Sequence, residues 1–208
     1  MKKLLNTFMV SVSNQQIPQS FRAHRPKVFQ WLGKIMLFIF GWKVKGSIAN
    51  EYRDKKLVVI FAPHTSNWDG ILGFAAIAGL DVRITFIGKH TAFQYPLGAF
   101  LRYMGGIPVD RSRPGGVVQV VIDKIKHNES ALIALSPEGT RSKVVEWKTG
   151  FLRIAKELNA KIVPVSLDFS KKEILFGNVF TPSGNNKKDI LDLKGYYSIF
   201  TPKHPEKY

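Results

Sequence analysis

Apolar residues in this chain form short continuous runs, and longer stretches with helical spacing lie between them. The runs at 57–62, 131–135 and 162–167 are typical of strands that are buried on both faces. Further extended segments are predicted at 84–87, 107–109 and 174–180, and helices at 71–80, 96–104, 117–125, 151–158 and 190–197. Strands that alternate with helices in this way predict an α/β fold, with a largely parallel or mixed central sheet flanked by helices.

Pro164 interrupts the last of the continuous runs, 162–167. A proline has no backbone N–H and leaves a gap in the hydrogen-bond ladder of a sheet. The run is therefore predicted to be an edge strand, or to have Pro164 at a strand end.

A separate apolar run, residues 28–42, precedes the first of these strands. As a helix it would measure roughly 22 Å, at ~1.5 Å per residue, against a hydrocarbon core of ~30 Å. Trp31, Trp42 and the flanking lysines are typical anchors in a lipid headgroup layer. The run is therefore predicted to lie in a membrane interface, and an ordinary core helix is the alternative. We divide the chain into a membrane-associating helical segment, 1–46, and an α/β domain, 47–208.

The composition adds a strong positive charge and excludes cysteine chemistry. The 208 residues contain no cysteine and carry a formal net charge of +16. Disulfides, thiolate zinc sites and catalytic cysteines are therefore excluded. The charge predicts an anionic partner: nucleic acid, an anionic bilayer or a phosphorylated substrate. Because residues 1–56, around the apolar run, carry eleven Lys and Arg against two acids, anionic lipid is favoured over nucleic acid.

His64 and Asp69 follow the run 57–62, where a buried strand is expected to end and a helix to begin. Ligands collect at such strand ends in α/β folds. If Asp69 lies in the first helical turn, its carboxylate can reach back to one imidazole nitrogen and leave the other free to take a proton. The alternative is a capping box that starts at Ser66, in which Asp69 only closes the helix. The residues alone leave both interpretations open.

Two serines lie near strand ends, Ser66 and Ser136. Neither is part of the Gly-x-Ser-x-Gly turn that exposes a serine nucleophile, and a capping role accounts for Ser66. A covalent acyl-enzyme is therefore not predicted, although a serine hydrolase that uses Ser66 stays an alternative.

Two loops that follow predicted strands, 105–111 and 136–142, each contain glycine and an arginine. Glycine permits unusual backbone angles, and the arginine fork suits a phosphate group. A surface turn with an ion pair is the alternative. The candidate substrate-binding residues are Glu138, Gly139, Thr140, Arg141, Arg111 and Lys148.

Four blocks in this order resemble the motifs of the phospholipid/glycerol acyltransferase family, which includes 1-acylglycerol-3-phosphate acyltransferases. His64 and Asp69 match a His followed by four residues and an Asp, and Gly106–Arg111 match the second motif. Ser136–Ser142 match Phe-Pro-Glu-Gly-Thr-Arg-Ser, with Ser136 in place of the usual aromatic residue. Ile162–Val165 match the fourth, an apolar strand with a central proline.

This resemblance implies transfer of an acyl group from acyl-CoA or acyl-acyl carrier protein to a hydroxyl of a lysophospholipid, most simply 1-acylglycerol-3-phosphate, in phospholipid biosynthesis. It implies that His64 is the general base, that Asp69 orients it, and that the residues of the two loops hold the acceptor. Neither a metal nor a cofactor is required beyond the acyl donor. Backbone amides after His64, or near Pro164, are expected to stabilise the oxyanion. The enzyme is expected on the cytoplasmic face of the cell membrane.

Other functions stay open on the sequence. Ser136 in the third motif and Asn67-Trp68 within the first leave the acceptor undecided between lysophosphatidate, another lysolipid and an amine-bearing lipid. A non-enzymatic basic protein that binds lipid or nucleic acid is the remaining alternative. Because the sequence contains no nucleic-acid-binding motif, no nucleic acid partner is expected.

Overall fold

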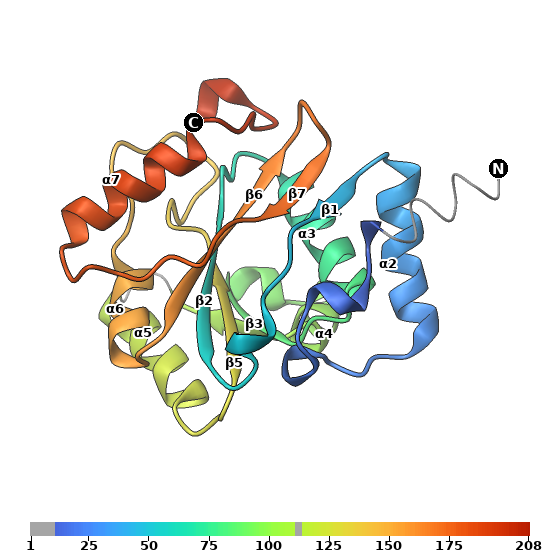
Figure 1. The fold of residues 1–208 in the computed structure, drawn as a ribbon, viewed down its shortest axis with the longest axis horizontal. Coiled ribbons are helices and arrows are strands. Elements are labelled where there is room, and N and C mark those ends of the chain that lie inside the picture. The colour runs from blue at the N-terminus through green and yellow to red at the C-terminus, as the bar shows by residue number, and fades with distance from the viewer. Residues whose placement is uncertain (1–10, 111–113) are drawn as a thin grey trace.

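The computed structural model describes residues 11–110 and 114–208 of the chain. Within these ranges seven strands form one sheet, with helices on both of its faces (Figure 1). The strands are β1 (Lys43–Lys45), β2 (Lys56–Ala62), β3 (Ile84–Lys89), β4 (Gly106–Val109), β5 (Ala131–Leu135), β6 (Lys161–Asp168) and β7 (Glu173–Phe176). The α-helices are α2 (Lys27–Ile39), α3 (Asn67–Gly79), α4 (Leu97–Tyr103), α5 (Pro114–Ile125), α6 (Gly150–Glu157) and α7 (Asn186–Tyr197).

The sheet is mixed but mostly parallel, in the order β1-β7-β6-β2-β5-β3-β4. Five adjacent strands run parallel to one another, namely β6, β2, β5, β3 and β4. Strand β7 is antiparallel to β6, and β1 is parallel to β7. The predicted α/β class is therefore confirmed. Because the five parallel strands end at one edge, the loops after β2 and β5, which are adjacent, lie side by side there.

Two hydrophobic layers enclose the sheet, as the continuous apolar runs predict. Leu57 and Val59 of β2 face one layer, while Val58 and Ile60 face the other, and all four are buried. The first layer includes residues of α2 and α3, on the right of Figure 1, and the second includes residues of α5, α6 and α7, on the left. The hydroxyl of Tyr197 in α7 donates to the Ile60 carbonyl at 2.7 Å, which ties α7 to the strand that precedes His64.

Pro164 lies inside the sheet, so the prediction of an edge strand is wrong. Strand β6 is paired with β2 on one side and with β7 on the other. The Pro164 carbonyl accepts from the Gly177 amide at 2.8 Å, on the side of β7, and β7 itself has ended at Phe176. Because the N–H and C=O of one strand residue point to the same side, the missing N–H faces the place where the regular β6–β7 pairing has stopped.

Helix α2 has one packed face and one exposed apolar face. Gly33 packs so closely on α3 that a Cβ there would lie 2.5 Å from the Ala75 carbonyl oxygen, and Leu37 is fully buried. The apolar residues exposed along its outer face are Val28, Trp31, Leu32, Ile35, Phe38 and Ile39. The helix ends at Ile39, before the end of the run 28–42. Trp42 is buried, and Lys43–Lys45 form β1. No helix in the described ranges is long and apolar enough to cross a bilayer.

The segment that precedes β2 contributes to the same core as the rest of the chain. Val12, Ile17 and Phe21 are buried in the layer that also holds α3, and β1 extends the sheet. The division at residue 46 and the membrane role of the first segment stay predictions, and residues 1–10 lie outside the described ranges.

Candidate active site

The turn after β2 is built by the first residues of α3. Ser66 is the N-cap, and its hydroxyl accepts from the Trp68 amide at 3.1 Å. Asp69 closes the capping box, because its Oδ2 accepts from the Ser66 amide at 2.8 Å and from the Thr65 amide at 2.7 Å. The turn therefore satisfies its own amides and fixes the Asp69 carboxylate beneath it.

The same oxygen of Asp69 contacts His64, at 3.0 Å from the ring Nδ1. The Asp69 side chain is fully buried, whereas 20% of the His64 side chain is exposed. Since an ionised carboxylate only accepts, Nδ1 carries the hydrogen and Nε2 is left with a lone pair. The two interpretations of Asp69 are therefore compatible: the cap is what places its carboxylate against the imidazole.

This arrangement corrects one expectation about the oxyanion. The amides of Thr65 and Ser66 both donate to Asp69, so these two groups are not available to a developing oxyanion. The Ser66 hydroxyl is engaged by the Trp68 amide, which gives Ser66 the role of a helix cap.

Glu138 reaches the same turn from the neighbouring strand. It follows β5, which is paired with β2 up to Ile60 and Leu135, and it is 4% exposed. Its Oε2 accepts from the His64 amide at 2.9 Å and from the Ser136 hydroxyl at 3.1 Å. Burial, with a smaller contribution from the Asp69 carboxylate, raises the pKa of Glu138 to about 7, even though its hydrogen bonds with Ser136 and His64 lower it. A carboxyl with a pKa near neutrality therefore lies directly behind the turn that holds His64.

The loop after Glu138 presents polar groups to solvent. Gly139 has a φ of +67°, and a Cβ there would lie 2.9 Å from Cδ of Lys148. The Lys148 amide donates to the Pro137 carbonyl at 2.8 Å, which closes the loop at its base. Thr140, Arg141 and Lys148 are exposed. These residues are therefore within reach of a ligand at this edge of the sheet.

Helix α7 supports the far side of this loop. The Lys194 ammonium donates to the Val145 carbonyl at 2.8 Å and lies 5.9 Å from the centre of the Trp147 ring. Trp147 in turn packs edge-on against Tyr197, at 5.7 Å between ring centres. The loop is thus anchored to the same helix that holds the end of β2.

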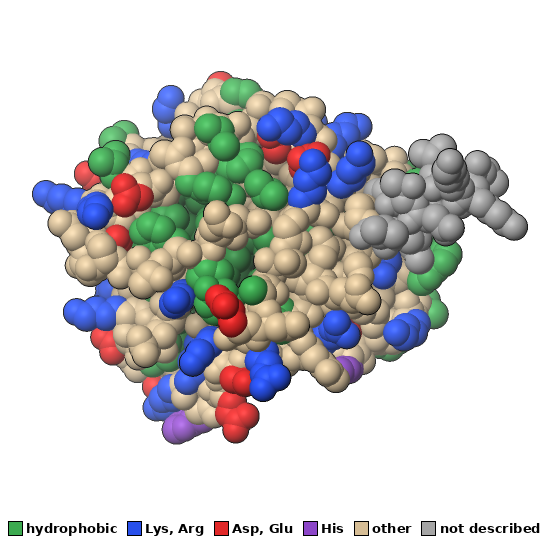
Figure 2. All heavy atoms as spheres, in the orientation of Figure 1, with side chains coloured by type: hydrophobic (Ala, Val, Ile, Leu, Met, Phe, Trp, Pro, Cys, Tyr) green, Lys and Arg blue, Asp and Glu red, His purple; other side chains and the backbone are tan. Residues whose placement is uncertain are grey.

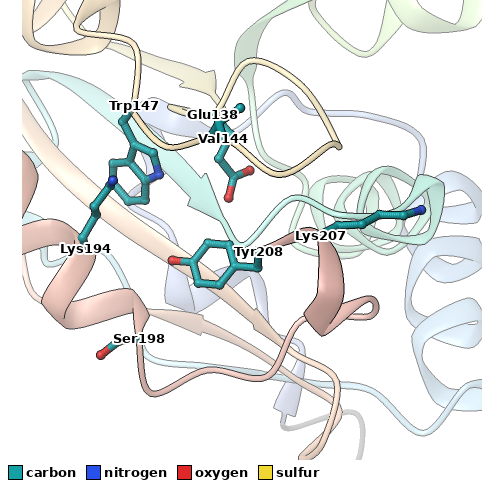
Figure 3. A pocket seen from close by; sticks show the side chains of 7 residues that line it. All are labelled: Glu138, Val144, Trp147, Lys194, Ser198, Lys207 and Tyr208. Atoms are coloured by element: carbon teal, nitrogen blue, oxygen red, sulfur yellow. The ribbon is translucent and has the colours of Figure 1, made fainter.

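A cavity of about 230 Å³ lies between this loop, α7 and residues 204–208 (Figure 3). Its lining consists of Glu138, Val144, Trp147, Lys194, Ser198, Lys207 and Tyr208. In Figure 3 the carboxylate of Glu138 points toward the ring of Tyr208. Burial, and secondarily the charge of Glu138, raise the pKa of Tyr208 to about 12. Lys207 and Tyr208 therefore form one wall of the space behind the turn that holds His64.

The same C-terminal segment contacts the turn directly, because the His204 amide donates to the Thr65 hydroxyl at 3.2 Å. Sequence reasoning missed this contact, since residues 198–208 carry no motif or periodicity that connects them to His64.

The structure brings five of the predicted acceptor-binding residues together, namely Glu138, Gly139, Thr140, Arg141 and Lys148, in one loop beside His64. Arg111 lies outside the described residues. Strand β4, which ends at Val109, finishes at the same edge of the sheet.

Comparisons with known proteins identify a family and a shared fold. Residues 43–168 match the protein family described as Acyltransferase. The 1-acyl-sn-glycerol-3-phosphate acyltransferase of Bacillus subtilis is 32% identical over 111 residues, which are 52% of this chain and 54% of that protein. The match thus spans about half the length of the curated relative. The crystal structure of the 1-acyl-sn-glycerophosphate (LPA) acyltransferase PlsC of Thermotoga maritima shares the fold, with a TM-score of 0.58 and 18% identity, over 85% of this chain and 81% of that one.

Proposed function

The chain belongs to the Acyltransferase family, and we propose that it transfers an acyl group from a thioester to the free hydroxyl of 1-acylglycerol-3-phosphate. One observation carries the proposal: Nδ1 of His64 lies 3.0 Å from the buried Asp69 carboxylate, at the end of a parallel strand. That geometry supports an oriented general base. The acceptor is proposed by analogy with the protein of Bacillus subtilis, whose name includes the same substrate.

The reaction follows from the proton that His64 can take. Nε2 removes the proton of the acceptor hydroxyl while its oxygen attacks the thioester carbonyl carbon. The tetrahedral intermediate collapses, the C–S bond breaks, and the imidazolium returns the proton to the departing thiolate. The buried Asp69 carboxylate stabilises the imidazolium between these steps. General-base assistance of this kind contributes about 10²–10⁴-fold, and positioning supplies the remainder.

The loop after Glu138 is proposed to bind the phosphate of the acceptor. Arg141 and Lys148 are exposed there, and Gly139 and Thr140 bring backbone and hydroxyl groups to the same place. Arg111, two residues after β4, is proposed to bind the same phosphate. The carboxylate of Glu138 is held by internal hydrogen bonds, so its predicted contact with the acceptor stays a prediction. The donor is acyl-CoA or acyl-acyl carrier protein, and no cofactor takes part.

The outer face of α2 is proposed to attach the protein to the cytoplasmic face of the cell membrane. Val28 and Ile39 are each 71% exposed at the two ends of this apolar face. Phe40 packs edge-on against Trp68, at 5.2 Å between ring centres, so the apolar surface continues to the first turn of α3. Trp68 lies between His64 and Asp69 in sequence and is 38% exposed. A lipid acceptor held in the bilayer would thus be presented beside the base.

The face of the molecule drawn in Figure 2 lacks a continuous basic stripe of the kind that binds nucleic acid. Lysine and arginine side chains lie on this face in several separate groups, some of them beside acidic side chains. A nucleic acid backbone favours a continuous basic stripe or groove.

The test compares the wild type with His64→Ala in vesicles that contain 1-acylglycerol-3-phosphate and a labelled acyl donor, CoA or carrier protein. We expect His64→Ala to lose at least a hundredfold in kcat. His127→Ala, which removes an exposed histidine after α5, is the matched control and should retain full activity.

Each other outcome has a definite meaning. Equal turnover by His64→Ala would overturn the assignment of the base. Transfer to another lysolipid or an amine-bearing lipid, with none to 1-acylglycerol-3-phosphate, would overturn the proposed acceptor. No transfer to any lipid, with steeply salt-dependent binding to random DNA, would identify a non-enzymatic basic protein.

A further inference from the structure

We propose that Ser136 is a positioning residue, whose hydroxyl directs the Glu138 carboxylate at the backbone amide of His64. The proposal concerns the position at which the chain departs from the family that it resembles, because an aromatic residue is usual there. The phenylalanine of the motif cannot donate the hydrogen bond that the Ser136 hydroxyl donates. The role of Ser136 in the transfer reaction rests on the proposed function, whereas its effect on Glu138 can be tested without it.

The contacts form one path from Ser136 to the base. The Ser136 hydroxyl donates to Oε2 of Glu138 at 3.1 Å, and the same oxygen accepts from the His64 amide at 2.9 Å. The other oxygen, Oε1, lies 3.3 Å from that amide. The His64 backbone is therefore held by Glu138, while its ring is held by Asp69. A shift of the backbone would move Nε2 relative to the acceptor, to which catalysis is sensitive.

This path depends on the charge of Glu138. A hydrogen bond from an amide to an ionised carboxylate is roughly twice as strong as one to a neutral acid. None of the ion pairs among the described residues involves Glu138. The hydroxyl of Ser136 and the amide of His64 are therefore the groups that favour its ionised form, against burial and the Asp69 carboxylate.

Several other charged or titratable groups lie around Glu138. Asp69 approaches from α3, and the Lys148 side chain lies across the neighbouring Gly139. The remaining groups come from the catalytic turn, α7 and the C-terminal segment, and they are His64, Lys194, Tyr197, Lys207 and Tyr208. Each of these is unchanged by a substitution at Ser136, so a change in the titration of Glu138 would report the lost hydroxyl.

The test is a titration of Glu138 in the full-length protein by carbon NMR of glutamate carboxyl groups. The sequence contains seven glutamates, and the Glu138 signal is identified by its loss in Glu138→Gln. In Ser136→Ala and Ser136→Phe we expect the midpoint to rise by about half a pH unit to one pH unit, as the loss of one hydrogen bond implies. Ser136→Thr keeps a hydroxyl and should titrate like the wild type. The matched control is Ser198→Ala, which removes a hydroxyl from the same cavity. That hydroxyl donates to the Gly195 carbonyl and not to Glu138.

The kinetic readout separates this role from a structural one. As the pH falls, protonation of Glu138 should reduce kcat. In Ser136→Ala the acid limb of the plot of kcat against pH should therefore move to higher pH. Above pH 8.5 the kcat values of the variant and the wild type should converge. A uniform loss of kcat at every pH, or a Glu138 midpoint that does not move, would overturn the proposal. If the wild type transfers no acyl group while the midpoint still shifts, the proposed function fails and the control of Glu138 by Ser136 stands.

Discussion

The backbone amide of His64 donates to Oε2 of Glu138 at 2.9 Å, although 74 positions separate the two residues. This contact joins the loops after two adjacent parallel strands, β2 and β5. It places a carboxylate on each side of the histidine, with Asp69 at the ring and Glu138 at the backbone. The base of the proposed reaction is thus fixed at two points, and the consequences of loosening each point can be measured separately.

Replacing Asp69 with Asn should slow catalysis with little change in the affinity for substrates. The amide cannot stabilise an imidazolium as a carboxylate does, and kcat is expected to fall about 10²–10⁴-fold. Asp69→Asn should retain the secondary structure of the wild type by circular dichroism, because the amide oxygen can still accept from the Thr65 and Ser66 amides. A rise in KM with an unchanged kcat would contradict the assignment of Asp69 as the residue that orients the base.

Glu138→Gln should remove a pH dependence of stability. Because the pKa of Glu138 is raised from 4.5 to about 7, the folded state between these values keeps a proton that the unfolded chain releases. The free energy of unfolding therefore falls as pH rises through this window, by about 3 kcal/mol in total. Urea melts at pH 5 and pH 8 should show this drop in the wild type and in the exposed control Glu146→Gln. If Glu138→Gln shows the same drop as the wild type, burial does not raise the pKa of this group.

Much of this site could be predicted from the sequence, because its parts are local. The capping residues Ser66 and Asp69 lie three apart, and the strand before them is a continuous apolar run, so the turn that places His64 against Asp69 follows from short-range rules. The loop from Glu138 to Arg141 follows a second such run. What pairs these loops is the order of the strands, in which β5 lies next to β2.

Other features depend on long-range packing that no local pattern encodes. His204 contacts Thr65, and Tyr208 forms a wall beside Glu138. Both contacts depend on the path that the chain takes after the end of α7. Strand β1 is too short, at three residues with two lysines, to give a recognisable pattern. Pro164 made the prediction of an edge strand wrong. The missing N–H is accommodated because the partner strand β7 ends beside it, and not because β6 itself ends or lies at the edge of the sheet.

Gly33 should tolerate no side chain, because it sets the distance between α2 and α3. A Cβ at this position would lie 2.5 Å from both the Ala75 carbonyl oxygen and the Gly79 amide nitrogen. Gly33→Ala is expected to lower the free energy of unfolding by about 1–3 kcal/mol. Gly73→Ala, in α3 with nothing within 4 Å of its added Cβ, should instead stabilise the helix by about 0.5–1 kcal/mol. Thermal melts of the two variants with opposite shifts would verify the close packing; equal shifts would contradict it.

Arg141→Ala should weaken binding of the phosphorylated acceptor and leave the acyl donor unaffected. Loss of one charge-assisted hydrogen bond is expected to raise KM for a short-chain 1-acylglycerol-3-phosphate by about tenfold or more, with KM for the thioester unchanged. The control is Arg153→Ala, which removes another exposed arginine, on α6. A larger effect on the donor than on the acceptor would reassign this loop to the thioester.

The apolar face of α2 should determine how much of the protein binds to vesicles. Leu32 and Ile39 are 58% and 71% exposed on that face, while Leu191 and Ile199, on and just beyond α7, are 70% and 71% exposed. Helix α7 covers the opposite face of the sheet from α2. The two double variants therefore remove the same types of side chain from different faces of the protein. Replacing Leu32 and Ile39 with serine removes apolar surface worth about 1.5–3 kcal/mol for each side chain that is fully buried in lipid. Sedimentation with anionic vesicles is therefore expected to fall at least tenfold in that variant, whereas the Leu191 and Ile199 serine variant should sediment like the wild type. Equal losses in both variants would show that hydrophobicity over the whole surface, and not the face of α2, holds the protein on lipid.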